Sequence, residues 1–307
     1  MATRNALIAL VGAVVIACAA GCGTSSTPTT SAHGPAYTLL APSGYGPQSV
    51  LPFSDLGRPY EVAVDTAGNV YATDIHWARN RFPADTDRVL MLAAGSNRQT
   101  VLPYNFITDL AVDNARAVYV VDTRNERLVK LAAGPNTQTV LSFTGFDGEV
   151  KAVDSAGNIY GVRGGGEVPG GGCCKPVEVV KLAAGSSTWS VLLTGVNFTD
   201  VGVDGAGSLY VVDFHEVLKL AAGASAPTRL PFGDLKNPSG LGVDGGGNVY
   251  VADFDNNRVL KLAAGASGPT VLPFTGLNHP TGVAADTAGS VYVADSDNHR
   301  VVELPTQ

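Results

Sequence analysis

Residues 241–274 read LGVDGGGNVYVADFDNNRVLKLAAGASGPTVLPF. The stretch contains two short runs rich in Val, each ending in Asp, with a Gly-containing turn between them. RVLKL and TVLPF follow, and small or polar residues precede each of them. Short runs with β-branched and aromatic residues, separated by Gly and Asp, predict strands rather than helices. The stretch therefore predicts four short antiparallel strands in succession.

This unit recurs six times from residue 50 onward. The first runs of the six units are VAVD (62–65), LAVD (110–113), KAVD (151–154), VGVD (201–204), LGVD (241–244) and VAAD (283–286). Four strands repeated at about 40 residues are typical of propeller blades, so the chain is expected to be an all-β, six-bladed β-propeller.

The last unit ends at RVVELPTQ (300–307) and lacks a fourth run. SVLPF at 49–53 precedes the first complete unit and matches TVLPF at 270–274. We therefore expect the N-terminal strand 49–53 to close the last blade, which removes exposed sheet edges. The expected propeller domain spans 48–307.

The first residues read MATRNALIALVGAVVIACAAGC. Arg4 and the short apolar run after it predict a cleaved export signal rather than a membrane-spanning helix. Small residues before a cysteine resemble a bacterial lipoprotein signal. Cys22 is the favoured lipidation site and Cys18 the alternative, because the polar run that starts after Cys22 suits a tether. This predicts a signal peptide at 1–21, a flexible tether at 22–47 and a membrane anchor. An ordinary signal and a secreted product are the alternative.

The stretch PTGVAADTAGSVYVADSDNHRV at 280–301 resembles the NHL repeat. The phrases KLAAG and TVLPF, which recur between units, resemble the extracellular sensor propeller of mycobacterial receptor serine/threonine kinases of the D type. The resemblance implies a six-bladed NHL propeller on the extracytoplasmic side of the cell membrane. It does not imply kinase activity, because the sequence has no kinase catalytic loop and no DFG motif. The net charge of −7 argues against nucleic acid as a partner.

Two insertions, 75–87 and 164–177, both join a second strand to a third. They are expected to share one face, which is the candidate partner-binding face. Neutral loop drift is the alternative. The first insertion offers aromatic and basic residues of the kind that form interface hot spots, namely His76, Trp77, Arg79, Arg81 and Phe82. Alternatively, Trp77 and Phe82 pack onto their own blade.

The second insertion contains Cys173 and Cys174. The other two cysteines belong to the signal or the anchor, so the mature chain offers no distant disulfide partner. Consecutive Cα atoms are about 3.8 Å apart, which is below the usual disulfide range. A strained vicinal bridge and a bridge to another molecule both stay open.

Three acidic residues occupy the position four before the Asp that ends the first strand, where the last two units have Gly. These are Glu61, Asp109 and Asp200. They are expected to ring the mouth of the central channel, where oxygen ligands suit Ca²⁺. Solvated acids at a wide, wet mouth are the alternative. The recurring Asp after the second strand and the Arg that begins the third are expected to pair within blades.

Two hypotheses of function follow. The favoured one is a non-catalytic, lipid-anchored propeller that binds a protein, peptide or glycan and serves sensing, adhesion or envelope scaffolding. The alternative is a calcium-dependent enzyme of the lactonase or lyase type, with the three acids as ligands and His279 or His215 as base. No nucleophile–base pair can be named for the enzyme hypothesis, and fold analogy alone is a weak argument.

Overall fold

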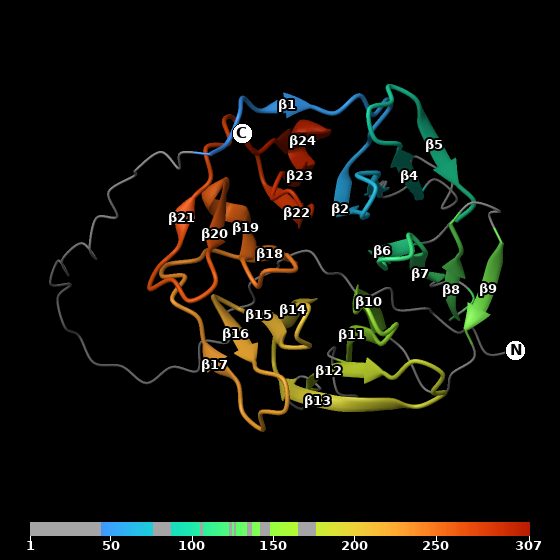
Figure 1. Ribbon diagram of the computed structural model, residues 1–307, viewed down its shortest axis with the longest axis vertical. Coiled ribbons are helices and arrows are strands. Elements are labelled where there is room, and N and C mark those ends of the chain that lie inside the picture. Colours follow the sequence, from blue (N-terminus) through green and yellow to red (C-terminus); the bar gives the residue numbers. More distant parts are fainter. Residues whose placement is uncertain are drawn as a thin grey trace, which may run out of the picture. The chain divides into compact units, whose positions relative to one another are not determined.

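The computed structural model describes residues 44–75, 87–104, 107–122, 125, 127–133, 137–141, 148–164 and 176–307. These residues form six four-stranded antiparallel sheets arranged in a ring (Figure 1). The prediction of an all-β, six-bladed β-propeller is confirmed. Two short 3-10 helices, Phe254–Asn256 and Ser296–Asn298, are the helical elements of the described chain. Among the described residues, no helical segment has the length and hydropathy of a membrane span.

The strands follow the repeat, with four in each blade. Blade 1 contains β2 (Pro59–Val64), β3 (Val70–Asp74), β4 (Arg88–Leu92) and β5 (Gln99–Leu102). Blade 2 contains β6 (Ile107–Val112), β7 (Val118–Asp122), β8 (Arg127–Leu131) and β9 (Gln138–Leu141). Blade 3 contains β10 (Gly148–Val153), β11 (Ile159–Gly164), β12 (Val177–Leu182) and β13 (Trp189–Gly195). Blade 4 contains β14 (Phe198–Val203), β15 (Leu209–Asp213), β16 (Glu216–Leu220) and β17 (Thr228–Arg229). Blade 5 contains β18 (Pro238–Val243), β19 (Val249–Asp253), β20 (Arg258–Leu262) and β21 (Thr270–Val271). Blade 6 contains β22 (Pro280–Ala285), β23 (Val291–Asp295), β24 (Arg300–Leu304) and β1 (Ser49–Val50).

The sheet of blade 6 contains a strand from the other end of the chain. β1 lies antiparallel to β24, with Ser49 opposite Glu303, so the strand order is β1-β24-β23-β22. The strand expected at 49–53 is only two residues long. Pro52 has no N–H to donate, and Phe53 N–H donates to Leu51 O (2.8 Å) instead of to the ladder.

Each first hairpin is set by an Asp, as blade 1 illustrates. Asp65 Oδ1 accepts N–H bonds from Ala67 (2.8 Å) and Asn69 (2.9 Å), and Asp65 Oδ2 accepts from the Tyr71 hydroxyl (3.1 Å). Gly68 has φ +80, which a residue without Cβ adopts at little cost. The D-x-x-G-N-x-Y pattern therefore specifies the turn from β2 to β3.

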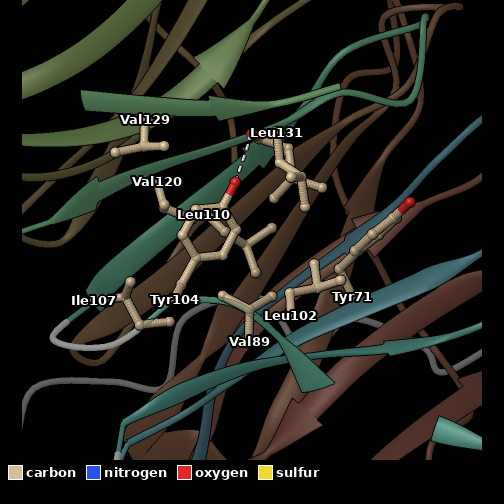
Figure 2. Packing of buried hydrophobic residues seen from close by; sticks show 10 residues of the cluster. Tyr71, Val89, Leu102, Tyr104, Ile107, Leu110, Val120, Val129 and Leu131 are labelled. Carbon is tan, nitrogen blue, oxygen red and sulfur yellow. Dashed lines mark hydrogen bonds between the residues drawn. The ribbon is translucent and has the colours of Figure 1, made fainter. Parts of the chain in front are cut away.

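The hydrophobic core lies between neighbouring blades. The buried side chains of the described residues form six clusters, one at each of the six interfaces in the ring. Figure 2 shows the cluster between blades 1 and 2, where Tyr71 and Leu102 pack with Leu110 and Val120 around Tyr104. Burial of these side chains stabilises the ring by about 25 cal/mol per Å² of apolar surface removed from water.

The antiparallel order gives the propeller two distinct faces. We call "loop face" the one with the connections from second to third strands and from one blade to the next. We call "turn face" the one with the hairpin turns from first to second strands and the turns, mostly with the sequence AAG, that follow the third strands. The described ends of both insertions, Ile75 with Asp87 and Gly164 with Pro176, lie at the loop face because they follow second strands and precede third strands.

Candidate functional site

The predicted partner-binding residues lie outside the described residues. His76, Trp77, Arg79, Arg81 and Phe82 fall in residues 76–86, and Cys173 with Cys174 falls in 165–175. Cys18 and Cys22 precede residue 44. These assignments stay predictions.

The central channel contains a cavity of about 160 Å³. The first strands β2, β6, β10, β14, β18 and β22 all line it, and Figure 1 shows these strands innermost in the ring. Most lining side chains are Val, Leu and Ala, whereas Glu61 and Lys151 add charge. Because the first strands begin at the loop face, the charged end of the channel lies on the same side as the insertions.

Lys151 is the charged residue that sequence reasoning did not identify. Its side chain is 5% exposed and forms ion pairs with Asp109 of blade 2 and with Glu149 (3.0 Å to Oε2). A β-bulge in β10 falls between Val150 and Ala152, whereas the bulge in β14 falls before Asp200, the residue equivalent to Val150. Bulges re-aim side chains. The displaced bulge therefore places Lys151 among the acids of the neighbouring blades.

The three predicted acids also have backbone partners. Asp109 Oδ1 accepts from Leu110 N–H (2.8 Å), and Glu61 Oε1 accepts from Val62 N–H (3.2 Å). Asp200 joins two blades, because its oxygens accept from Val201 N–H (2.7 Å) and from Leu241 N–H of blade 5 (2.6 Å). The carboxylates are thus fixed elements of the inner ring.

Burial has the largest effect on the pKa values of the three acids and of Lys151. It raises the pKa of Asp109 to about 7 and that of Asp200 to about 6, although Lys151 opposes both shifts. Burial, followed by repulsion from Asp109 and Asp200, raises the pKa of Glu61 well above its ordinary value. Burial alone would lower the pKa of Lys151, but Asp109 and Glu149 raise it well above its usual range.

This arrangement differs from both predictions for the acids, namely a calcium site and a group of solvated carboxylates. Asp109 and Asp200 are buried, at 1% and 4% exposed, so the expectation of solvated acids at a wide mouth is wrong for them. Glu61 is partly exposed to the channel. In the described part of the chain, no three His, Cys, Asp or Glu side chains gather into a group that could hold a metal ion. The cation beside Asp109 is the ammonium group of Lys151, so the geometry gives the calcium prediction no support.

The ring is tighter on the side where the repeat has Gly. A Cβ placed on Gly240 would lie 2.0 Å from Thr281 O of the next blade, so the inner strands of blades 5 and 6 meet where no side chain fits. The acidic residues are consequently confined to the other blades.

The loop face of blades 5 and 6 carries an ordered polar and aromatic group. Asp297 Oδ2 is 2.7 Å from His279 Nδ1, and Asp297 Oδ1 is 2.5 Å from Arg58 Nη2. The His279 ring lies against Phe254, with centroids 4.5 Å apart. These residues come from four connections of the loop face, which these contacts hold together. His215, the other candidate base, lies on blade 4.

The predicted Asp–Arg pairs are found in blades 1, 2, 5 and 6. They are Asp74–Arg88, Asp122–Arg127, Asp253–Arg258 and Asp295–Arg300. Blade 3 has the reversed pair Arg163–Glu178 (2.9 Å). The first residue of each pair lies directly opposite the second across the ladder. In these five blades the pairs therefore join the second and third strands of one blade and have a structural role.

Blade 4 departs from this framework. Asp213 lies opposite Glu216, so two carboxylates face each other where the other blades have an acid and a base. Glu216 pairs with the exposed Arg229 (2.9 Å), whereas Asp213 has no basic partner among the described residues. Burial and then the Glu216 charge raise the pKa of Asp213.

The turn between these acids exposes an aromatic ring. Phe214 is 56% exposed and has φ +53, and its ring meets His215 edge-on with centroids 4.0 Å apart. A bulky residue at positive φ is an outlier that structures retain mainly where it serves a purpose. The short loop was visible in the sequence, but nothing in the residue pattern predicted the left-handed Phe214.

The chain enters the propeller at the turn face. Tyr45 pairs with Thr306, and Gln307 N–H donates to Gly44 O (2.9 Å). Thr306 Oγ1 also donates to Ala288 O (3.2 Å) in the first hairpin turn of blade 6. The start of the described chain and the C-terminus therefore lie on the face opposite the insertions.

Comparisons with known proteins agree with this architecture. The NHL-repeat family model matches residues 235–262 and 277–304, which are the first three strands of blades 5 and 6 with their preceding loops. No curated protein sequence matches the chain significantly. The fold and these matches define a six-bladed β-propeller that contains NHL repeats.

Three solved structures with this fold are distant from the chain in sequence. A gluconolactonase from Xanthomonas campestris is 14% identical, with 85% of this chain and 89% of that chain covered and a TM-score of 0.64. A chain of a nidogen/laminin complex is 17% identical over 77% and 84%, with a TM-score of 0.59. A streptogramin B lyase is 12% identical over 86% and 98%, with a TM-score of 0.58. At these identities the likeness shows the fold alone.

Proposed function

We propose that this chain is a non-catalytic, lipid-anchored propeller outside the cytoplasmic membrane that binds a protein, peptide or glycan partner through its loop face. The observation that carries the proposal is the separation of the two faces. Gly44 and the C-terminus lie at the turn face, whereas the ends of both insertions and Phe214 lie at the loop face. A tether attached at Cys22, or at Cys18 in the alternative, would join the propeller at the turn face and leave the loop face free of the attachment.

The nature of the channel supports binding rather than catalysis. Asp109 and Asp200 are held by backbone N–H groups, and Lys151 supplies the positive charge beside Asp109. Such a network favours one arrangement of the inner ring, and the ammonium group of Lys151 occupies the position beside Asp109 that a metal ion would need. The gluconolactonase and the lyase share the fold, but shared fold does not transfer activity.

The proposal is tested by mapping which face contacts the partner in cells. A benzophenone amino acid is introduced at His215 or His299 on the loop face, or at Ala184 on the turn face, in the whole chain expressed in bacteria that make lipoproteins. Irradiation is expected to cross-link the same envelope component from both loop-face positions and not from Ala184. Cross-links from Ala184 alone, or equal yields from all three positions, would contradict the proposal.

The anchor is tested in parallel with a labelled fatty acid. Cys22→Ala is expected to lose the label and to leave the membrane fraction, whereas Cys18→Ala retains both. Loss of the label in Cys18→Ala alone would assign the lipid to the alternative cysteine. Absence of the label in the unaltered chain would overturn the anchor.

A further inference from the structure

We infer that the blade 4 hairpin Asp213–Glu216 is the centre of the partner-binding surface, and that it takes a peptide segment in which Lys or Arg lies next to an apolar side chain. This inference rests on the proposed function, because it names the part of the loop face that binds. Its first support is the break in the framework. Five blades place an acid opposite a base at this register, and blade 4 places Asp213 opposite Glu216.

Opposed like charges across a ladder are destabilising. Arg229 offsets part of the repulsion, but its side chain is 65% exposed and its pair with Glu216 is therefore weak. A basic side chain from outside would complete at Asp213 the acid–base pair that the other blades supply internally. The position is reachable, since Asp213 is only partly buried and ends a strand at the loop face.

Phe214 supplies the apolar half of the surface. Its ring is exposed at the tip of the hairpin, and positive φ is disfavoured for a residue with a bulky side chain. Asn or Gly would suit the turn better, so the ring has no folding role that explains it. Exposed aromatic residues beside charged groups are typical interface hot spots. The charges and the ring together match a basic and apolar peptide better than a neutral glycan.

The inference is tested with a displayed library of random short peptides, selected on the whole chain purified in detergent. We expect enriched peptides to carry Lys or Arg next to an aliphatic or aromatic residue. Their affinity is expected to fall about tenfold or more in Phe214→Asn, as for a hot-spot residue. Glu216→Arg, which places a base opposite Asp213, is expected to weaken the same peptides, and added salt should weaken binding to the unaltered chain.

The variants are chosen so that misfolding is not the cause of a loss. Asn tolerates positive φ, so Phe214→Asn is expected to unfold at the same temperature as the unaltered chain or higher. Val101→Ser is the matched control, because Val101 on β5 is 55% exposed and lies away from the hairpin. It is expected to change no peptide affinity.

Equal recovery of binders on the unaltered chain and on Phe214→Asn would overturn the inference. Enriched peptides without basic residues, or a neutral glycan that binds and is insensitive to Glu216→Arg, would do the same. Neither result touches the proposed function if loop-face cross-links persist. Cross-links from the turn face would instead remove the proposed function itself.

Discussion

Lys151 of blade 3 forms an ion pair with Asp109 of blade 2 inside the central channel, and both side chains are almost fully buried. The pair joins the inner strands of neighbouring blades at the end of the channel that lies at the loop face. Glu149 and Asp200 add further negative charge around it.

Removal of the ammonium group should therefore be costly. Lys151→Met leaves Asp109 and Glu149 without their cation, and we expect the free energy of unfolding to fall by about 3–5 kcal/mol at neutral pH. Lys130→Met is the control, because Lys130 pairs with Asp113 (3.4 Å) on a partly exposed side chain and should cost about 1 kcal/mol or less. Urea unfolding measures both. Equal losses would mean that the buried network has no special role.

Stability should also depend on pH through the acids of the channel. The pKa values of Asp109 and Asp200 are raised to about 7 and about 6, so between roughly pH 4 and pH 7 the folded state binds more protons than the unfolded state. The stability contributed by these groups therefore falls as pH rises through that window.

The variant Glu61→Gln measures the contribution of Glu61 to the pH dependence of stability. The amide keeps an oxygen for Val62 N–H and carries no charge, and the pKa of Glu61 is raised by burial and by its acidic neighbours. The stability of the variant relative to the unaltered chain should thus increase with pH, with the smallest difference near pH 4. Urea midpoints measured across this range provide the test, and a difference independent of pH would contradict the assignment.

Calcium provides a direct comparison with the alternative function. Because Lys151 lies beside Asp109, we expect the thermal midpoint of the chain to be the same with Ca²⁺ and with chelator. A rise in the midpoint with Ca²⁺, absent from Glu61→Ala/Asp109→Ala/Asp200→Ala, would instead make the channel mouth a metal site and favour the enzyme.

The close approach of blades 5 and 6 gives a packing prediction. Gly240→Ala would place a methyl group 2.0 Å from Thr281 O, and we expect it to destabilise the chain by about 3 kcal/mol. Gly245→Ala is the matched control, since a Cβ there meets nothing within 4 Å, and its effect should stay within about 0.5 kcal/mol. Thermal unfolding of both variants measures the difference, and similar midpoints would contradict the tight inner ring.

Much of the fold was predictable because each blade repeats the same local chemistry. Asp65, Gly68 and Tyr71 specify a hairpin through contacts within a few residues, and the same residue types recur at the same spacing. The Asp–Arg pairs were predictable for the same reason, since their members flank one loop. Blade count follows from repetition alone.

The features that distinguish the blades were less accessible. The shared repeat position of Glu61, Asp109 and Asp200 was visible in the sequence, but the burial of Asp109 and Asp200 depends on how closely the six inner strands approach. Lys151 reaches the channel through a displaced bulge, which depends on strand register rather than on residue type. The sequence contains both Asp213 and Glu216, but only the pairing of β15 with β16 shows that these two residues lie opposite each other.

The proposal that partners bind at the loop face can be tested by amide hydrogen exchange of the chain, alone and with the cross-linked component after its purification. We predict slower exchange in peptides that cover 212–217, 254–258 and 296–300, and unchanged exchange in the hairpin turns at 65–68 and 244–247. Protection confined to those turns, or to the outer strands β5, β9 and β13, would contradict the claim.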